Sequence, residues 1–294
     1  MPEPQIAPEP LTAQVPKLPR ADARARLVFK AGKNGAETSS LLQQAPLRVL
    51  FPYPAQGDIT TAAITNTSGG LVGGDRLAVE LIAEKGARIL ACQQAAEKVY
   101  RSAGQSSLVD VSITAEDGAW AEWLPQETIL FEGSDLRRCN VINMAPGSTV
   151  LAGEMLVFGR EAHGESLTSV VLKETWEVRR AGRLVWADIL ELGEDVSAVL
   201  AHPAGLAGAR ASATVVFAGP DNGNKPGEDL LVAVRTLARD RSVRFGASMV
   251  NGILVMRWLG ENVAAMREDF GSTWELVRSK AGNLPPRLPR FWRV

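Results

Sequence analysis

Four carboxylates stand within or directly beside apolar stretches of the sequence, where a charged side chain is unusual. They are Asp75 after a glycine-rich turn, Glu97 in CQQAAEKVYRS, Glu154 in STVLAGEMLVFG and Asp188 in RLVWADILEL. Removing a carboxylate from water costs free energy unless an arginine, a hydrogen-bond network or a cation satisfies it. Ion pairs with Arg76, Arg101 or Arg160 would explain each carboxylate taken singly.

A second explanation is a passage for a metal ion. If several of these carboxylates converge on one wet passage, their oxygens suit a divalent ion that is held weakly enough to move on. Thiolate and imidazole ligands would hold a nickel-like ion far more tightly. The residues alone leave structural ion pairs and transient metal ligands both open.

A glycine-rich turn precedes the first of these carboxylates in NTSGGLVGGDRLAVEL. Its four glycines are Gly69, Gly70, Gly73 and Gly74. A phosphate-binding loop needs Lys followed by Ser or Thr and then a helix, whereas Asp75 and Arg76 follow here and lead into a strand. We therefore interpret the stretch as a tight turn whose glycines let strands approach closely and position Asp75. Arg76 is expected to balance the charge of Asp75.

Side chains common in enzyme active sites are scarce. The only histidines are His163 and His202, and the sequence contains no CxxC, HExxH or GxSxG motif. Cys92 and Cys139 lie far apart in apolar contexts. We interpret both as buried thiols of a reducing compartment, not as a disulfide.

The elements that must position these residues are mainly strands. From Ala25 to about Phe217, short apolar or alternating segments recur between Gly, Pro, Asp and Asn, which predicts a mostly β body. RRAGRLV and AEDGAWAEW are interpreted as hairpins. Later, EDLLVAVRTLARDR and ENVAAMREDFGSTWELVRSKAG predict two α-helices in the C-terminal part, although Gly271 weakens the second.

Composition limits the partners and the location. The 294 residues include 32 Lys and Arg against 33 Asp and Glu, so no charge excess indicates nucleic acid or a membrane surface. The start lacks the pattern of a secretion signal, and no apolar run is long enough to span a bilayer. We expect a cytoplasmic protein with a disordered Pro-rich tail over residues 1–24 and a single domain over residues 25–294.

Five segments in this order resemble the signature motifs of the urease accessory protein UreD family, also called UreH. They are TSGGLVGGDRL, QQAAEKVYRS, WLPQETILFEGSDLR, GEMLVFGREAHGE and LPRFWRV. The resemblance runs from about residue 25 to the C-terminus. It implies a non-enzymatic scaffold that binds apo-urease and UreF, and through UreF the GTPase UreG. No cofactor would be bound permanently, and nickel would be in transit.

The resemblance also implies a fold and a set of site residues. The fold is a mostly β, helically wound body, of β-helix or sandwich type, with two α-helices in its C-terminal part. Asp75, Glu154 and Asp188 match acids that line an internal passage for the ion, and we assign Glu97 to the same passage. Four further residues are candidates for partner contact or for packing: Tyr100, Arg101, Arg160 and Trp292. Relatives usually have a Thr-Thr pair where this chain has Cys92 and Gln93, so Cys92 is either a soft nickel contact or a core residue.

Two other classes of function are compatible with a β-rich chain. A carbohydrate-active hydrolase would use paired acids, for which Glu127 and Glu132 are the candidates. Their spacing within one strand-like segment directs them to opposite faces, which counts against this alternative. The third possibility is an assembly module without any role in metal handling.

Overall fold

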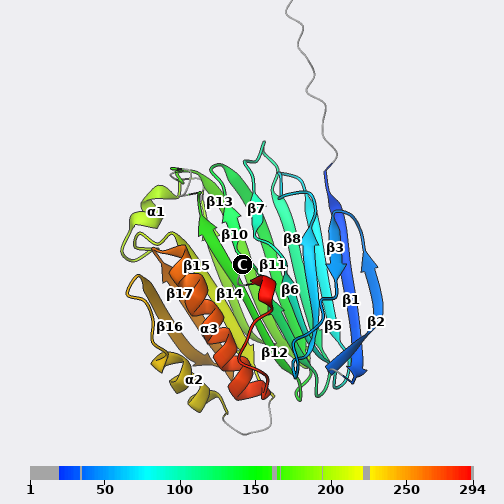
Figure 1. Cartoon of the computed structure of the whole chain (residues 1–294). Coiled ribbons are helices and arrows are strands. Elements are labelled where there is room, and N and C mark those ends of the chain that lie inside the picture. Colours follow the sequence, from blue (N-terminus) through cyan, green and yellow to red (C-terminus); the bar gives the residue numbers. More distant parts are fainter. Residues whose placement is uncertain are drawn as a thin grey trace, which may run out of the picture.

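The chain folds into two packed β-sheets, which its strands visit in turn (Figure 1). The structure is a computed structural model that describes residues 20–33, 35–160, 164–165, 167–193, 195–220 and 226–292. Sheet A has seven strands in the order β14 (Arg183–Leu192), β13 (Val170–Arg180), β11 (Ser134–Met144), β8 (Ser107–Ala115), β5 (Arg76–Ala83), β1 (Asp22–Gly32) and β2 (Gly35–Gln43).

Sheet B has ten strands. Eight of them follow the order β16 (Val243–Val250), β17 (Ile253–Gly260), β15 (Ala211–Ala218), β12 (Thr149–Phe158), β9 (Trp120–Leu124), β6 (Arg88–Gln93), β4 (Thr60–Asn66) and β3 (Leu47–Leu50). The short strands β10 (Thr128–Leu130) and β7 (Glu97–Val99) extend from β12.

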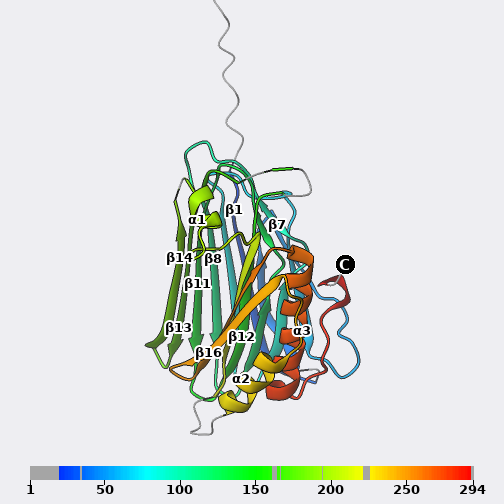
Figure 2. The same ribbon diagram turned by 90° about the vertical axis from the view of Figure 1, so that its left-hand side faces the viewer.

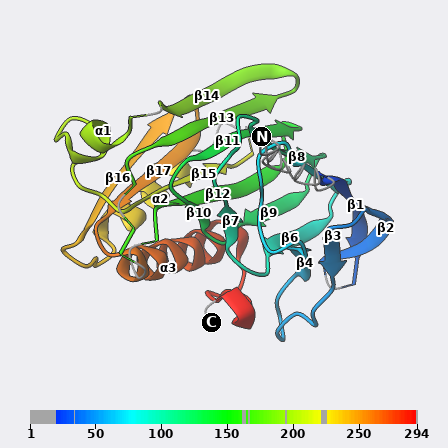
Figure 3. The same cartoon turned by 90° about the horizontal axis from the view of Figure 1, so that it is seen from above.

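From β4 to β13 the chain alternates between the two sheets, apart from the short strands β7 and β10, so this part winds as a coil. β4, β6, β9 and β12 are parallel neighbours in sheet B, and β5, β8, β11 and β13, each of which follows one of them, are parallel neighbours in sheet A. Parallel neighbours require a crossover connection, and here the crossover is a strand of the other sheet. Figure 3 shows the two layers from above. The predicted mostly β, helically wound body is therefore confirmed.

The two sheets differ in how they are buried. Along β11 and β13, buried residues alternate with more exposed ones, because only the inner face of sheet A is covered. β9 is buried at every position and β12 at all but one, since sheet B packs against sheet A on one face and under helices on the other (Figure 2). The protein thus has two apolar cores: one between the sheets, and an outer core between sheet B and its helices.

Both predicted C-terminal helices are present as α2 (Pro226–Thr236) and α3 (Val263–Gly282), and the five-residue α1 (Ser197–Ala201) was not expected. α3 begins at the N-cap Asn262, whose side chain accepts from the Ala265 N–H at 3.0 Å. Close packing explains why glycine occupies position 271: a Cβ there would lie 3.0 Å from the ring of Trp292. Trp292 belongs to a short 3₁₀ turn (Arg290–Trp292) that docks on α3.

A buried ion-pair network fastens α3 to sheet B. Arg278 of α3 has no exposed side-chain area, and its Nη2 lies 2.8 Å from Asp58 Oδ1 and 3.3 Å from Glu122 Oε1. The indole N–H groups of Trp120 and Trp274 donate to Glu122 at 2.9 and 2.7 Å. The charge of Glu122 is therefore matched and hydrogen-bonded inside the outer core.

The structure confirms one of the two predicted hairpins and shows that the other prediction is wrong. RRAGRLV forms the β13–β14 hairpin, with Ala181 and Gly182 at φ of 48° and 79°. AEDGAWAEW instead joins β8 of sheet A to β9 of sheet B. Gly118, at φ of 68°, turns the chain between layers. Alternating strands flanking a tight turn look the same in sequence for a hairpin and for such a corner.

The N-terminal boundary also differs from the expected one. β1 begins at Asp22, so residues 22–24 belong to sheet A and not to the predicted tail. The rest of that prediction concerns residues 1–19, which lie outside the described residues. No helix in the described ranges is long and apolar enough to cross a lipid bilayer.

Candidate functional site

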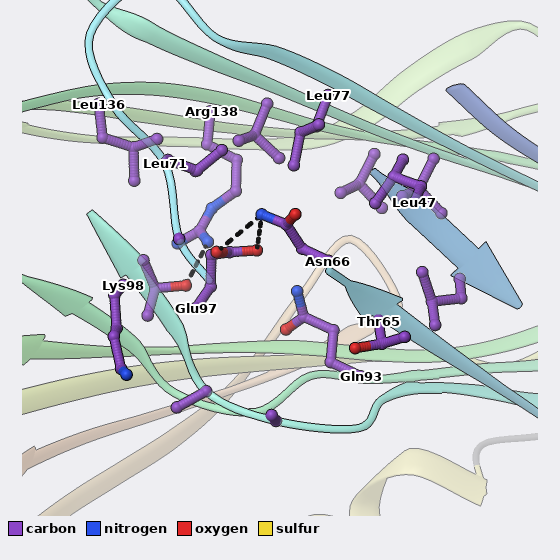
Figure 4. Close-up of a pocket in the computed structure, with 18 of the residues that line it drawn as sticks. Leu47, Thr65, Asn66, Leu71, Leu77, Gln93, Glu97, Lys98, Leu136 and Arg138 are labelled. Atoms are coloured by element: carbon purple, nitrogen blue, oxygen red, sulfur yellow. Dashed lines mark hydrogen bonds between the residues drawn. The ribbon is translucent and has the colours of Figure 1, made fainter. Parts of the chain in front are cut away.

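A cavity of about 180 Å³ lies between the two sheets beside Glu97 (Figure 4). Its walls are mostly apolar side chains, and its polar groups include Asn66, Gln93, Glu97 and Arg138. The Asn66 amide donates to both Glu97 oxygens, at 3.1 and 3.2 Å. Glu97 thus faces the cavity with a hydrogen-bonding partner, but it forms no ion pair within the part of the chain that the structure describes.

Deeper in the same layer, a buried cluster joins both sheets. Arg138 of β11 places Nη2 at 2.9 Å from Glu174 Oε2 of β13 and at 3.0 Å from Glu154 Oε1 of β12. Its Nη1 donates to Thr128 Oγ1 at 2.9 Å. Burial raises the pKa of Glu154 to about 8, although the adjacent Arg138 opposes this rise. With two carboxylates and one guanidinium, the cluster carries more potential negative than positive charge.

The spaces continue from this cluster toward the surface. A void of about 20 Å³, enough for one water molecule, is bordered by Glu154, Glu174 and Asp188. Asp188 also borders an open hollow of about 430 Å³, where its Oδ2 pairs with Arg257 Nη2 at 2.6 Å. Glu97, the buried cluster and Asp188 therefore border a series of separate spaces, in which Asp188 is shared by the second and the third.

Asp75 has a different environment from the other three predicted carboxylates. Its Oδ1 accepts from the Ala21 N–H at 2.8 Å and its Oδ2 from the Val72 N–H at 2.9 Å. It is buried, whereas Arg76 is exposed. The expectation that Arg76 balances this charge is wrong, because Asp75 bonds to backbone N–H groups while Arg76, the first residue of β5, is exposed.

The four glycines form the turn that holds Asp75. Gly69 and Gly74 have φ of 84° and 95°, in the left-handed region that favours glycine. Gly70 and Gly73 allow close approach: a Cβ at Gly70 would lie 2.5 Å from the Tyr100 ring, and one at Gly73 would lie 2.5 Å from the Gln105 carbonyl oxygen. The turn therefore fits tightly against the segment that follows β7.

The four partner-or-packing candidates fall into two groups. Trp292 is buried and donates its indole N–H to the Pro125 carbonyl at 2.8 Å. The other three lie at the surface near Phe131. The Tyr100 ring packs edge-on against Phe131 at 4.9 Å, and the Arg160 guanidinium stacks over Phe131 at 4.1 Å. Arg101 is exposed beside them.

The predicted carboxylates do not pair with the arginines that the sequence suggested. Arg160 pairs with Glu165 at 3.0 Å. Glu154 and Asp188 pair with Arg138 and Arg257 instead. Sequence position did not indicate this, because the partners come from strands that only the fold brings together.

Cys92 faces away from the cavity. It is fully buried in the outer core, where its thiol donates to the Ala62 carbonyl at 3.6 Å and burial raises the pKa of the thiol. The neighbouring Gln93 lines the cavity instead. Both cysteines are free, and the prediction that Cys139 is buried is wrong, since it is half-buried.

The paired acids of the hydrolase alternative do not act together. Both Glu127 oxygens accept from Arg267 of α3, at 2.6 and 2.7 Å. Glu132 accepts from the Thr168 hydroxyl at 2.6 Å and from backbone N–H groups beside it. No contact of either residue favours glycoside hydrolysis.

Sequence reasoning missed Arg138 and Glu174, two members of the buried cluster. The signal for Glu174 was present, because it shares a strand face with Leu172 and Trp176 at a period of two. The described residues contain no group of three or more His, Cys, Asp or Glu that could hold a metal ion. Any ion here would meet one or two carboxylates at a time.

Glu97 should make the stability of the protein depend on pH. Burial raises its pKa from 4.5 to about 7, while the hydrogen bond from Asn66 opposes the rise. Because the folded-state pKa is the higher one, the contribution of Glu97 is complete below pH 4.5 and is lost as pH rises through about 7. Urea unfolding at about pH 5 and about pH 8 should therefore show that the stability of Glu97→Gln relative to wild type changes with pH. The difference between the two free energies of unfolding should shift by about 1–2 kcal/mol in favour of Glu97→Gln at the higher pH. An equal difference at both pH values would contradict this.

Comparison with known proteins identifies the family. The family described as "UreD urease accessory protein" matches residues 21–293. A urease accessory protein UreD of Magnetococcus marinus is 42% identical over 274 residues, which cover 92% of this chain and 93% of that protein. Those of Azorhizobium caulinodans and Xanthobacter autotrophicus are 35% and 37% identical, over 96% and 93% of this chain and 100% and 90% of their own lengths. This chain therefore belongs to the UreD family of urease accessory proteins.

Proposed function

We propose that the chain is a scaffold that conducts nickel through the layer between its two sheets to apo-urease. The observation that carries this proposal is the succession of spaces bordered by Glu97, by Glu154 with Glu174, and by Asp188. Family membership supplies the pathway in which such a route would serve. Nickel is the cargo and not a resident cofactor.

The chemistry of the donors supports transfer in preference to storage. Carboxylate oxygens bind a nickel ion less tightly than imidazole or thiolate does. The walls between the carboxylates are mostly apolar and offer the ion no further charged oxygen ligand. Asp75 remains a prediction as a passage residue; with both oxygens bonded to backbone, its evident contribution is to hold the turn that lines the first cavity.

The partners that fit this role are apo-urease, UreF and, through UreF, the GTPase UreG. The balanced charge of the chain gives no support to a nucleic-acid or membrane partner. Two free cysteines suit the reducing cytoplasm, where we place the protein. The exposed Tyr100 and Arg101 and the half-buried Arg160 are candidates for a partner contact.

The direct test is in-frame deletion of the gene in cells that carry the urease operon. We expect a normal amount of urease apoprotein that is nickel-free and inactive, and we expect activity to return when the gene is supplied again. Urease activity and nickel content are measured on the purified apoprotein. Full activity after deletion would contradict the proposed function.

A further inference from the structure

Arg138 separates the first cavity from the rest of the route. Its side chain lines the cavity beside Glu97, while the two carboxylates that it binds line the next void. Its side chain is only 6% exposed. The guanidinium therefore lies between the first cavity and the carboxylates that border the void.

The guanidinium occupies the position that a divalent ion would take. Two carboxylate oxygens and the Thr128 hydroxyl lie within 3.0 Å of its Nη atoms. Hard oxygen donors of this kind also coordinate divalent cations. When both carboxylates are ionised, they balance a charge of two, of which Arg138 supplies one. While it remains in place, its positive charge repels any entering cation.

The first cavity offers Arg138 an alternative position. Figure 4 shows its guanidinium end directed toward the side of the cavity where Glu97 lies. Its Nε has no hydrogen-bond partner among the described residues, so one donor of the guanidinium is left unused while both Nη atoms are bonded. If the guanidinium moved into the cavity, its ion-pair partner would be Glu97 in place of Glu154 and Glu174. The metal ion would then be balanced by two carboxylates and Arg138 by one.

We infer that Arg138 is a resident cation that holds the divalent-ion position between Glu154 and Glu174 and closes the route until an entering ion displaces it toward Glu97. The identity of that ion as nickel rests on the proposed function. The binding site itself is a property of this chain alone, so it is tested without urease or its other accessory proteins.

The test is Ni²⁺ binding to the purified full chain by equilibrium dialysis, with thermal unfolding measured in parallel. Arg138→Gln should bind Ni²⁺ at least about tenfold more tightly than wild type, because the competing charge is gone. Arg138→Lys keeps that charge and should stay close to wild type. Arg138→Gln combined with Glu174→Gln is the matched control, which should lose the gain in affinity.

Thermal unfolding keeps the inference testable if Arg138→Gln is unstable. Its buried carboxylates then lack a counter-ion, and Ni²⁺ should restore folding or raise Tm far more than in wild type or in the double variant. Unchanged affinity in a folded Arg138→Gln protein, or failure of Ni²⁺ to rescue an unfolded one, would overturn the inference. Either result would leave the deletion experiment in cells unaffected.

Discussion

Glu154→Gln should yield urease that accumulates normally but contains little nickel, with specific activity reduced at least about tenfold. Loss of groups that only orient a metal ligand already costs about 10–100-fold in metal affinity or activity. The fold should survive, because Arg138 keeps its 2.9 Å bond to Glu174 and glutamine has the shape of a protonated glutamate. Urease activity and nickel content are measured in cells in which the variant replaces the wild-type gene.

Glu80→Gln provides the control for this experiment. Glu80 lies on β5 of sheet A and pairs with Arg26 at 3.0 Å, away from the spaces between the sheets. The same chemical change there should leave urease activation at the wild-type level. If Glu154→Gln activated urease as fully as Glu80→Gln, the carboxylate would have no part in transfer.

Arg278→Met should reduce the free energy of unfolding by about 3–5 kcal/mol, the largest loss of stability that we expect from one substitution. Arg278 is fully buried, and its replacement leaves Glu122 inside the outer core without a counter-ion. It also removes the bonds to Asp58 and to the Arg287 carbonyl that anchor the C-terminal segment. Urea denaturation of the two proteins measures the difference.

Arg26→Met is the matched control for Arg278→Met. It makes the same change in an ion pair whose two side chains are 39% and 29% exposed. Such pairs contribute about 0–1 kcal/mol, because water screens the charges. A loss below about 1 kcal/mol for Arg278→Met would show that Glu122 is adequately satisfied by its two tryptophans.

The secondary-structure elements that depend on neighbouring residues could be predicted from the sequence. Alternation and turn residues predicted the strands, and periodicity with acids first and bases last predicted α2 and α3. These signals depend on neighbours within a few residues. Even Gly271, which weakens a helix by propensity, was placed correctly within α3, although its reason lies in the later contact with Trp292.

The sequence did not predict which distant segments pair with one another. The corner at Gly118 and the ion pair between Arg138 and Glu154 both depend on which strands meet across the two sheets. Each predicted carboxylate therefore appeared alone in sequence, without its partner. Glu97, Glu154 and Asp188 border spaces between strands in the fold, whereas Asp75 bonds to backbone. A single residue type cannot distinguish these two environments.

α3 and Trp292 follow the strands of sheet B in the chain, and this order has a consequence for biosynthesis. The outer face of sheet B is assembled from strands made earlier, yet its apolar side chains are covered by α3, Leu288 and Trp292. During translation, the part of that face under α3, Leu288 and Trp292 stays open until these residues have been made. A nascent chain that lacks them exposes apolar surface, which general chaperones recognise.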